Sequence, residues 1–88
     1  MRISFVILHY NTYEDTIRCV ESILILAQKT FEDVSIVVVD NGSPNGTGDL
    51  LKGKYGRSEK IDVLLIKDNI GFARGNNVGF VFANKKYH

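Results

Sequence analysis

The sequence predicts an α/β domain of order βαβαβα, in three layers with a parallel sheet in the middle. Three short apolar segments rich in β-branched residues alternate with helix-type segments in units of about 30 residues, which is typical of right-handed crossovers. Hydrophobic residues make up 44% and charged residues 24% of the chain, as in ordinary globular proteins. The 88 residues have room for one small domain.

The first strand–helix–strand unit covers the N-terminal part of the chain. Residues 3–9 form an apolar run with β-branched and aromatic side chains, typical of a strand covered on both faces. Residues 13–28 carry apolar side chains at helical spacing, and Thr12 provides an N-cap. Residues 34–39 repeat the pattern of a buried strand.

The second half of the chain continues the alternation. Residues 42–48 read Gly-Ser-Pro-Asn-Gly-Thr-Gly, which is the strongest loop signal in the sequence. We expect a short helix over residues 47–55, a third strand over 61–67 and a last helix over 72–84.

Charge and composition exclude several classes of function. The net charge is +1, with 11 basic and 10 acidic residues, so no strong field attracts nucleic acid or an acidic membrane. No apolar run is long enough to span a membrane, and we expect a cytoplasmic location. The single cysteine, Cys19, excludes an internal disulfide and a cysteine zinc site. Its apolar neighbours predict a buried, unreactive thiol.

Polar residues follow the predicted strands at the edge where parallel sheets bind ligands. Tyr10 and Asn11 follow the first strand, and Asp40 and Asn41 end the second. The Asp40 carboxylate can accept hydrogen bonds from a base or a ribose hydroxyl; the alternative is that it only caps the next turn. His9 is interpreted as a hydrogen-bonded edge residue rather than a catalyst.

A glycine-rich turn runs into the last predicted helix. Asn69 and Gly71 form the turn, and Gly71 indicates a backbone position with positive φ or little steric room. Arg74 lies in the first helical turn, where a cation opposes the helix dipole, so a phosphate partner would explain it. The alternative is a surface arginine that covers apolar area. Asn77 could add a polar contact at the same edge. Binding of one nucleotide by both groups requires Asp40 and Arg74 to face a shared cleft, and we expect them to do so.

Three motifs resemble the N-terminal, nucleotide-binding part of family 2 glycosyltransferases, which have the Rossmann-like GT-A fold. They are residues 6–11 (VILHYN), 37–43 (VVVDNGS) and 69–79 (NIGFARGNNVG). In detail, these motifs are similar to those of rhamnosyltransferase-like members, which build bacterial surface polysaccharides. The resemblance implies that residues 1–88 are a truncated nucleotide-sugar-binding domain, one half of a GT-A domain.

The resemblance also implies roles for individual residues. Tyr10 and Asn11 would lie near the base, and Asp40 would contact base or ribose. The nucleotide pocket would be completed by a further set of residues: Asn41, Asn69, Gly71, Arg74 and Asn77. Family members transfer a sugar from a nucleoside diphosphate to an acceptor hydroxyl with inversion.

The catalytic parts of the family are missing from this sequence. Members usually hold Mg or Mn on an Asp-x-Asp motif and use a later acidic residue as base, and the 88 residues contain neither. We therefore expect no catalytic residue, metal site or cofactor here, and a chain that binds a nucleotide sugar without transferring it. Such a chain would be an excised segment, a truncated reading frame or a remnant. A full-length form could sit at the membrane periphery.

Two other functions remain open from the sequence. In GT-A proteins the first strand pairs with a strand supplied later in the chain, so residues 3–8 would form an apolar open edge. This edge predicts a non-catalytic module that forms a homo-oligomer. A fragment of another doubly wound family, such as a receiver, is disfavoured because acidic residues do not cluster after the first strand.

Overall fold

The computed structural model describes residues 2–30 and 32–88 and confirms the predicted βαβαβα order. The elements, in chain order, are β1 (Arg2–His9), α1 (Tyr13–Thr30), β2 (Asp33–Asn41), α2 (Thr47–Tyr55), β3 (Ile61–Ile66) and α3 (Phe72–Tyr87). No helix in these two ranges is long and apolar enough to cross a membrane.

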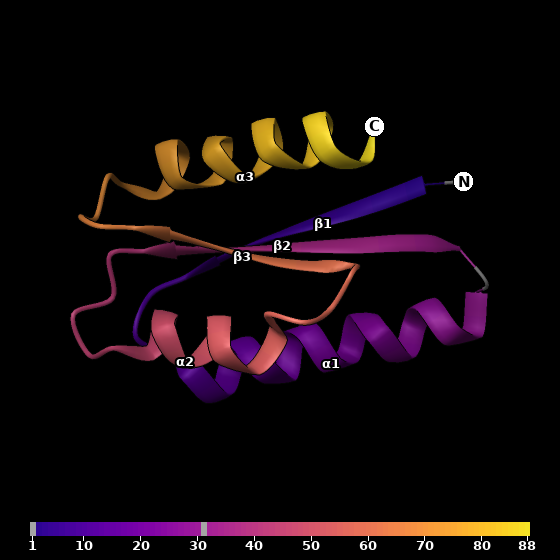
Figure 1. The fold of residues 1–88 in the computed structure, drawn as a ribbon, viewed down its shortest axis with the longest axis horizontal. Helices are drawn as coiled ribbons and strands as arrows, with labels where there is room; N and C mark the ends of the chain where they lie inside the picture. Colours follow the sequence, from indigo (N-terminus) through magenta and orange to yellow (C-terminus); the bar gives the residue numbers. More distant parts are fainter. Residues whose placement is uncertain (1, 31) are drawn as a thin grey trace.

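The three strands form one parallel sheet in the order β1-β2-β3, so β2 is central (Figure 1). Val6 pairs with Val37, and Val38 pairs with Val63. From Ser35 to Asn41 every residue of β2 is buried, because a central strand with helices on both sides has no solvent-exposed face. Within the described residues β1 pairs only with β2 and is therefore an edge strand.

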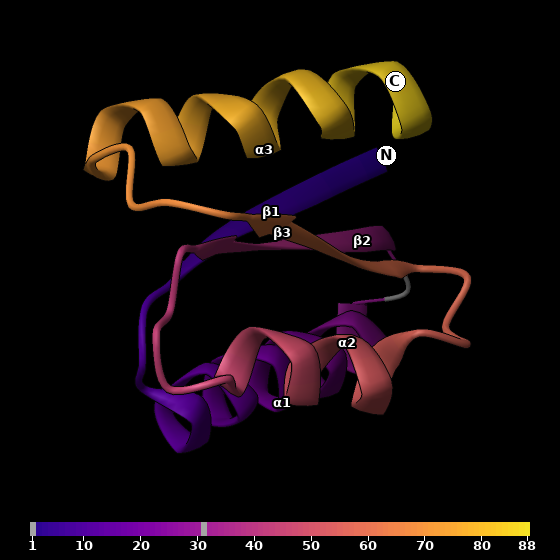
Figure 2. The ribbon, with the colours of Figure 1, turned by 60° about the vertical axis from the view of Figure 1, so that its left-hand side comes forward.

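Helices α1 and α2 lie on one face of the sheet, and α3 lies on the other (Figures 1 and 2). Side chains alternate along β2, so neighbouring residues belong to different layers. Ile36 and Val38 pack in a core with Val20 of α1 and Leu51 of α2. The other core, under α3, contains Val37, Val39 and Ala83.

Helix α3 packs closely on the sheet because two of its buried residues are glycines. A Cβ atom at Gly79 would lie 2.4 Å from Val6 Cγ1 and 2.9 Å from Val39 Cγ2. A Cβ atom at Gly75 would lie 2.6 Å from Leu8 Cδ1. Gly75 and Gly79, four residues apart on one face of α3, thus allow the helix to pack closely against the strands.

The prediction that Cys19 is buried is wrong, because its thiol is exposed. The buried residues of α1 are Thr16, Val20 and Ile23. Cys19 lies about a quarter turn from the centre of this stripe, and at that angle a helical side chain points along the surface.

We predict opposite effects of alanine at two helical glycines. Gly79→Ala should lower the free energy of unfolding by about 1–3 kcal/mol, because the new methyl group meets stiff, β-branched valines. Gly53→Ala in α2 is the matched control: a Cβ there meets nothing within 4 Å, so helix propensity should raise stability by about 0.5–1 kcal/mol. Urea unfolding of both variants measures the difference, and equal shifts would contradict the packing argument.

Candidate functional site

The candidate site lies at the edge of the sheet where the strands end. His9 of β1 is in register with Asp40 of β2, and Asn41 is in register with Ile66 of β3. The segments that follow the strands therefore start side by side, as expected for parallel strands. They carry the polar residues that the sequence motifs singled out.

Asp40 faces α2 and is almost completely buried. Its Oδ1 accepts a hydrogen bond from the Ser43 amide at 3.2 Å, so the turn-capping role that was weighed as an alternative is present. A Cβ atom at Gly48 would lie 1.9 Å from Oδ2, which shows how closely the first turn of α2 approaches the carboxylate. Within the described residues Oδ2 accepts no hydrogen bond.

Asn41 faces the opposite layer and organises the turn before α3. Its Oδ1 accepts the Ile70 amide at 3.0 Å, and its Nδ2 donates to Asn69 Oδ1 at 3.2 Å and to the Gly71 carbonyl at 3.3 Å. Asn69 Oδ1 also accepts the Gly71 amide at 2.8 Å. Gly71 has φ of +90°, as its place in the turn predicted. The side chains of Asn41 and Asn69 are thus engaged in holding this turn.

Tyr10 and Asn11 connect β1 to α1. Tyr10 is 43% exposed, so its ring is accessible to a planar ligand. Asn11 has a left-handed backbone with φ of +62°, which asparagine tolerates better than most residues. The Asn11 amide donates to Ser43 Oγ at 2.9 Å, and its side-chain Oδ1 is buried with no hydrogen-bond partner within the described residues.

Arg74 and Asn77 are exposed on the first turns of α3. Arg74 makes no ion pair or hydrogen bond with the described residues and is free to meet a ligand from solvent. The expectation that Asp40 and Arg74 face one shared cleft is wrong in this structure. Asp40 faces α2, whereas Arg74 belongs to the helix that covers the other face of the sheet (Figure 2).

A cavity of about 280 Å³ adjoins Asp40. Its walls are the loop after β2, the start of α2 and the end of β3, and Arg74 does not line it. Besides Asp40, the charged groups in its walls are Asp49 and Lys67. The cavity offers hydrogen-bond acceptors and one cation beside an apolar wall made by Leu65 and Ile66.

The described parts of the chain do not fit a divalent metal. In residues 2–30 and 32–88, no three histidine, cysteine or acidic side chains come close enough to hold one. Asp40 and Asp49 line the same cavity, but two carboxylates alone leave most positions of a hard cation to water. No chemical step is therefore assigned to a metal at this site.

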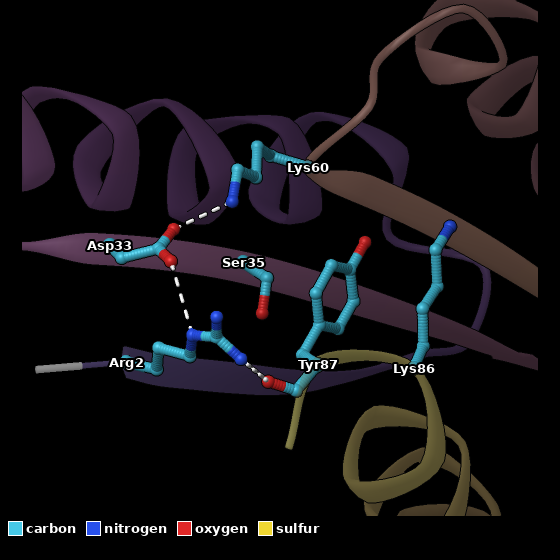
Figure 3. Close-up of a pocket in the computed structure, with 6 residues that line it drawn as sticks. All are labelled: Arg2, Asp33, Ser35, Lys60, Lys86 and Tyr87. Atoms are coloured by element: carbon cyan, nitrogen blue, oxygen red, sulfur yellow. Dashed lines mark hydrogen bonds and ion pairs between the residues drawn. The ribbon is translucent and has the colours of Figure 1, made fainter.

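A second cavity, of about 200 Å³, lies at the opposite edge of the sheet (Figure 3). Arg2 and Lys60 both reach Asp33, at 3.6 and 2.6 Å, and Arg2 also donates to the Tyr87 carbonyl. Lys86, which also lines the cavity, pairs with Asp62 at 2.7 Å. Each cation that lines this cavity therefore already has a carboxylate partner. The Lys86–Asp62 ion pair and the hydrogen bond from Arg2 to the Tyr87 carbonyl fasten the end of α3 to the sheet.

Four polar residues that hold the edge segments together were given no role by the sequence, although Ser43 lies within the 37–43 motif. Thr16, Ser43, Asn45 and Thr47 form hydrogen bonds among the edge segments. Thr16 could have been noticed, because it is a polar residue on the apolar stripe of the first helix, four residues before Val20. Ser43, Asn45 and Thr47 lie in the loop predicted at residues 42–48, where the residue types were fully explained by turn formation.

His9 is fully buried and is hydrogen-bonded on both ring nitrogens, as the sequence interpretation expected. Nδ1 lies 2.6 Å from Thr16 Oγ1, and Nε2 lies 2.8 Å from Thr47 Oγ1. Burial lowers the pKa of His9 below its ordinary value, and the Asp40 carboxylate partly offsets this effect.

The lowered pKa of His9 predicts an acid-sensitive fold. The unfolded chain takes up a proton on His9 as the pH falls below 6.5, while the folded chain stays unprotonated until its lower pKa is reached. The free energy of unfolding should therefore be constant above this window, decrease through it and level off below it. Urea unfolding between pH 8 and pH 5 tests this, with His9→Gln as the control that lacks the decrease. An equal decrease in both proteins would assign it to other groups.

Comparison with known proteins agrees with the sequence motifs. Residues 4–88 match the model of Glycosyl transferase family 2. The chain is also 31% identical over 85 residues to "Glycosyltransferase GlyG" of Streptococcus pneumoniae serotype 4 (strain ATCC BAA-334 / TIGR4). That match covers 97% of this chain and 27% of the relative, so the chain spans about a quarter of the relative's length. The strands and helices of residues 2–30 and 32–88 are arranged as in the Rossmann-like half of a GT-A domain. Together with the match over residues 4–88, this shows that the chain belongs to glycosyl transferase family 2.

Proposed function

We propose that this chain is the part of a family 2 glycosyltransferase that binds the nucleotide of an activated sugar. The observation that carries the proposal is the Asp40 carboxylate, which lines the cavity at the carboxyl edge of the sheet. One of its oxygens caps the turn, and the other accepts no hydrogen bond from the described residues. A carboxylate in this state can accept a hydrogen bond from a base N–H or a ribose hydroxyl.

The neighbouring residues suit the other parts of a nucleotide. Tyr10 presents an accessible ring on which a base could stack. Arg74 is an exposed cation at the start of α3, where helix amides also favour phosphate. Because Asp40 and Arg74 lie in different layers, a diphosphate that reaches Arg74 must cross the edge of the sheet beside the Asn69–Gly71 turn.

The proposal assigns binding rather than transfer to these 88 residues. Inverting transfer needs a base for the acceptor hydroxyl and stabilisation of the leaving diphosphate. The sequence has no Asp-x-Asp motif, and no described group fits a metal. We expect no sugar transfer by this chain alone. Rhamnosyltransferase-like specificity, a role in bacterial polysaccharide synthesis and a cytoplasmic location belong to the same proposal, supported by the sequence motifs.

The proposal predicts that Asp40→Asn weakens the binding of UDP or dTDP. The amide oxygen can still accept the Ser43 amide, so the turn is kept, but the free acceptor is replaced by a donor. Loss of a hydrogen bond to a charged group should reduce affinity by about tenfold or more. The affinity is measured from the backbone amide shifts of Tyr10 and of residue 40 during titration with UDP or dTDP.

The matched control for this titration is Asp33→Asn, which changes the net charge equally at the opposite edge of the sheet. Its affinity should equal that of the unmodified chain. Absence of any shift at millimolar UDP and dTDP would rule out nucleotide binding by these residues.

A second candidate function is self-association through β1, which is favoured by its place at the edge of the described sheet. Exposed apolar side chains on the neighbouring helix α3, among them Phe80 and Val81, add apolar surface. An open, apolar edge strand is a template for pairing with another chain. The proposed partner is a second copy of this chain.

Self-association predicts sedimentation as a dimer at high concentration and slower hydrogen exchange of the β1 amides as concentration rises. The β3 amides serve as an internal control, because β3 is the other edge of the same sheet. A monomer at all concentrations, with unchanged exchange in β1, would exclude this function.

A further inference from the structure

A continuous series of hydrogen bonds begins in α1 and passes through the buried ring of His9. Thr16 Oγ1 lies 2.6 Å from His9 Nδ1, and His9 Nε2 lies 2.8 Å from Thr47 Oγ1. Thr47 Oγ1 donates in turn to Asn45 Oδ1 at 2.7 Å. These contacts connect β1, α1 and the start of α2.

The same series continues to Asp40. Asn45 Nδ2 donates to the Asn11 carbonyl at 3.0 Å, and the Asn11 amide donates to Ser43 Oγ at 2.9 Å. The Ser43 amide donates to Asp40 Oδ1 at 3.2 Å. The network therefore joins the segment that carries Tyr10 and Asn11 to the segment that carries Asp40.

The direction of these bonds determines the tautomer of His9. The amide of Asn45 is oriented by its neighbours, because its Oδ1 accepts the Thr47 backbone amide at 3.2 Å and its Nδ2 donates to Asn11. Thr47 must then give its single hydroxyl hydrogen to Asn45 Oδ1, which leaves Thr47 Oγ1 as an acceptor for His9. His9 carries its hydrogen on Nε2, and its Nδ1 accepts from Thr16.

We propose that His9, in the Nε2–H tautomer, is a positioning residue that holds the loop after β2 and so places Asp40 and Asn11 for the nucleotide. The inference rests on the proposed nucleotide-binding function. His9, Thr16 and Thr47 are all buried, so water cannot replace a lost bond in this part of the network. The left-handed backbone of Asn11 is held by two of the same bonds, one to its amide and one to its carbonyl.

The protonation state of His9 matters for this role. A proton on Nδ1 would turn that nitrogen into a donor and force the Thr16 hydroxyl to rotate. The charged group that acts on His9 within the described residues is Asp40, and its carboxylate favours the proton. Burial acts in the other direction and outweighs it, which lowers the pKa and keeps the ring neutral.

The test compares Thr47→Val, which removes the hydroxyl that links His9 to Asn45, with Thr47→Ser, which retains it. Imidazole nitrogen shifts report the tautomer of His9, and hydrogen exchange of the Ser43 amide reports the order of the loop. UDP titration reports binding. We expect an Nε2–H ring and a protected Ser43 amide in the unmodified chain and in Thr47→Ser. Thr47→Val should lose that protection and bind UDP roughly five- to tenfold more weakly.

Gly79 provides a control within each spectrum, since its amide lies in α3 on the other face of the sheet and its exchange should not change. Unchanged UDP affinity in Thr47→Val would overturn the positioning role, as would an Nδ1–H ring in the unmodified chain. If the unmodified chain binds no UDP, the proposed function fails, and the positioning of a nucleotide fails with it. That case is distinguishable, because the tautomer and the Ser43 protection are measured without nucleotide.

Discussion

Successive side chains of the buried central strand point to opposite faces of the sheet, and this alternation governs the arrangement of the edge at which the strands end. Strand β2 is covered on both faces, so each successive side chain enters a different layer. At its carboxyl end this sends Asp40 toward α2 and Asn41 toward α3. Asp40 and Asn41 are neighbours in sequence, yet the first lines the cavity beside α2 and the second holds the turn before α3.

The two sides of the edge are consequently different in character. On the α3 side, Asn41 and Asn69 bond to each other and to backbone groups, so their polar atoms are occupied by partners within the chain. On the α2 side, Asp40 keeps one oxygen free beside a cavity. His9, buried beneath, connects β1 to α1 and to the start of α2. In the proposed function, the acceptor for a nucleotide lies on the α2 side and the exposed cation, Arg74, lies on the α3 side.

Much of the fold could be predicted because its signals are local. Apolar runs of β-branched residues marked all three strands, and the positive φ of Gly71 followed from its place in a turn. Contacts between distant segments were harder to predict. Cys19 has apolar neighbours in sequence, yet burial in a helix depends on angle around the axis, and the thiol lies outside the buried stripe. The partners of His9 come from residues 16 and 47, and no local pattern links them.

The sequence by itself determined the family, the alternation of strands and helices, and the gathering of Tyr10, Asn11 and Asp40 at one edge, because parallel strands end together. Only the tertiary structure decided that Asp40 and Arg74 belong to different layers. The crossovers α1 and α2 run in the same direction along the sheet and cover the same face, whereas α3 leaves the last strand, turns back over β2 and β1 and covers the other. The face that a helix covers depends on the order of strands in space, and this order is a property of the assembled sheet rather than of any segment.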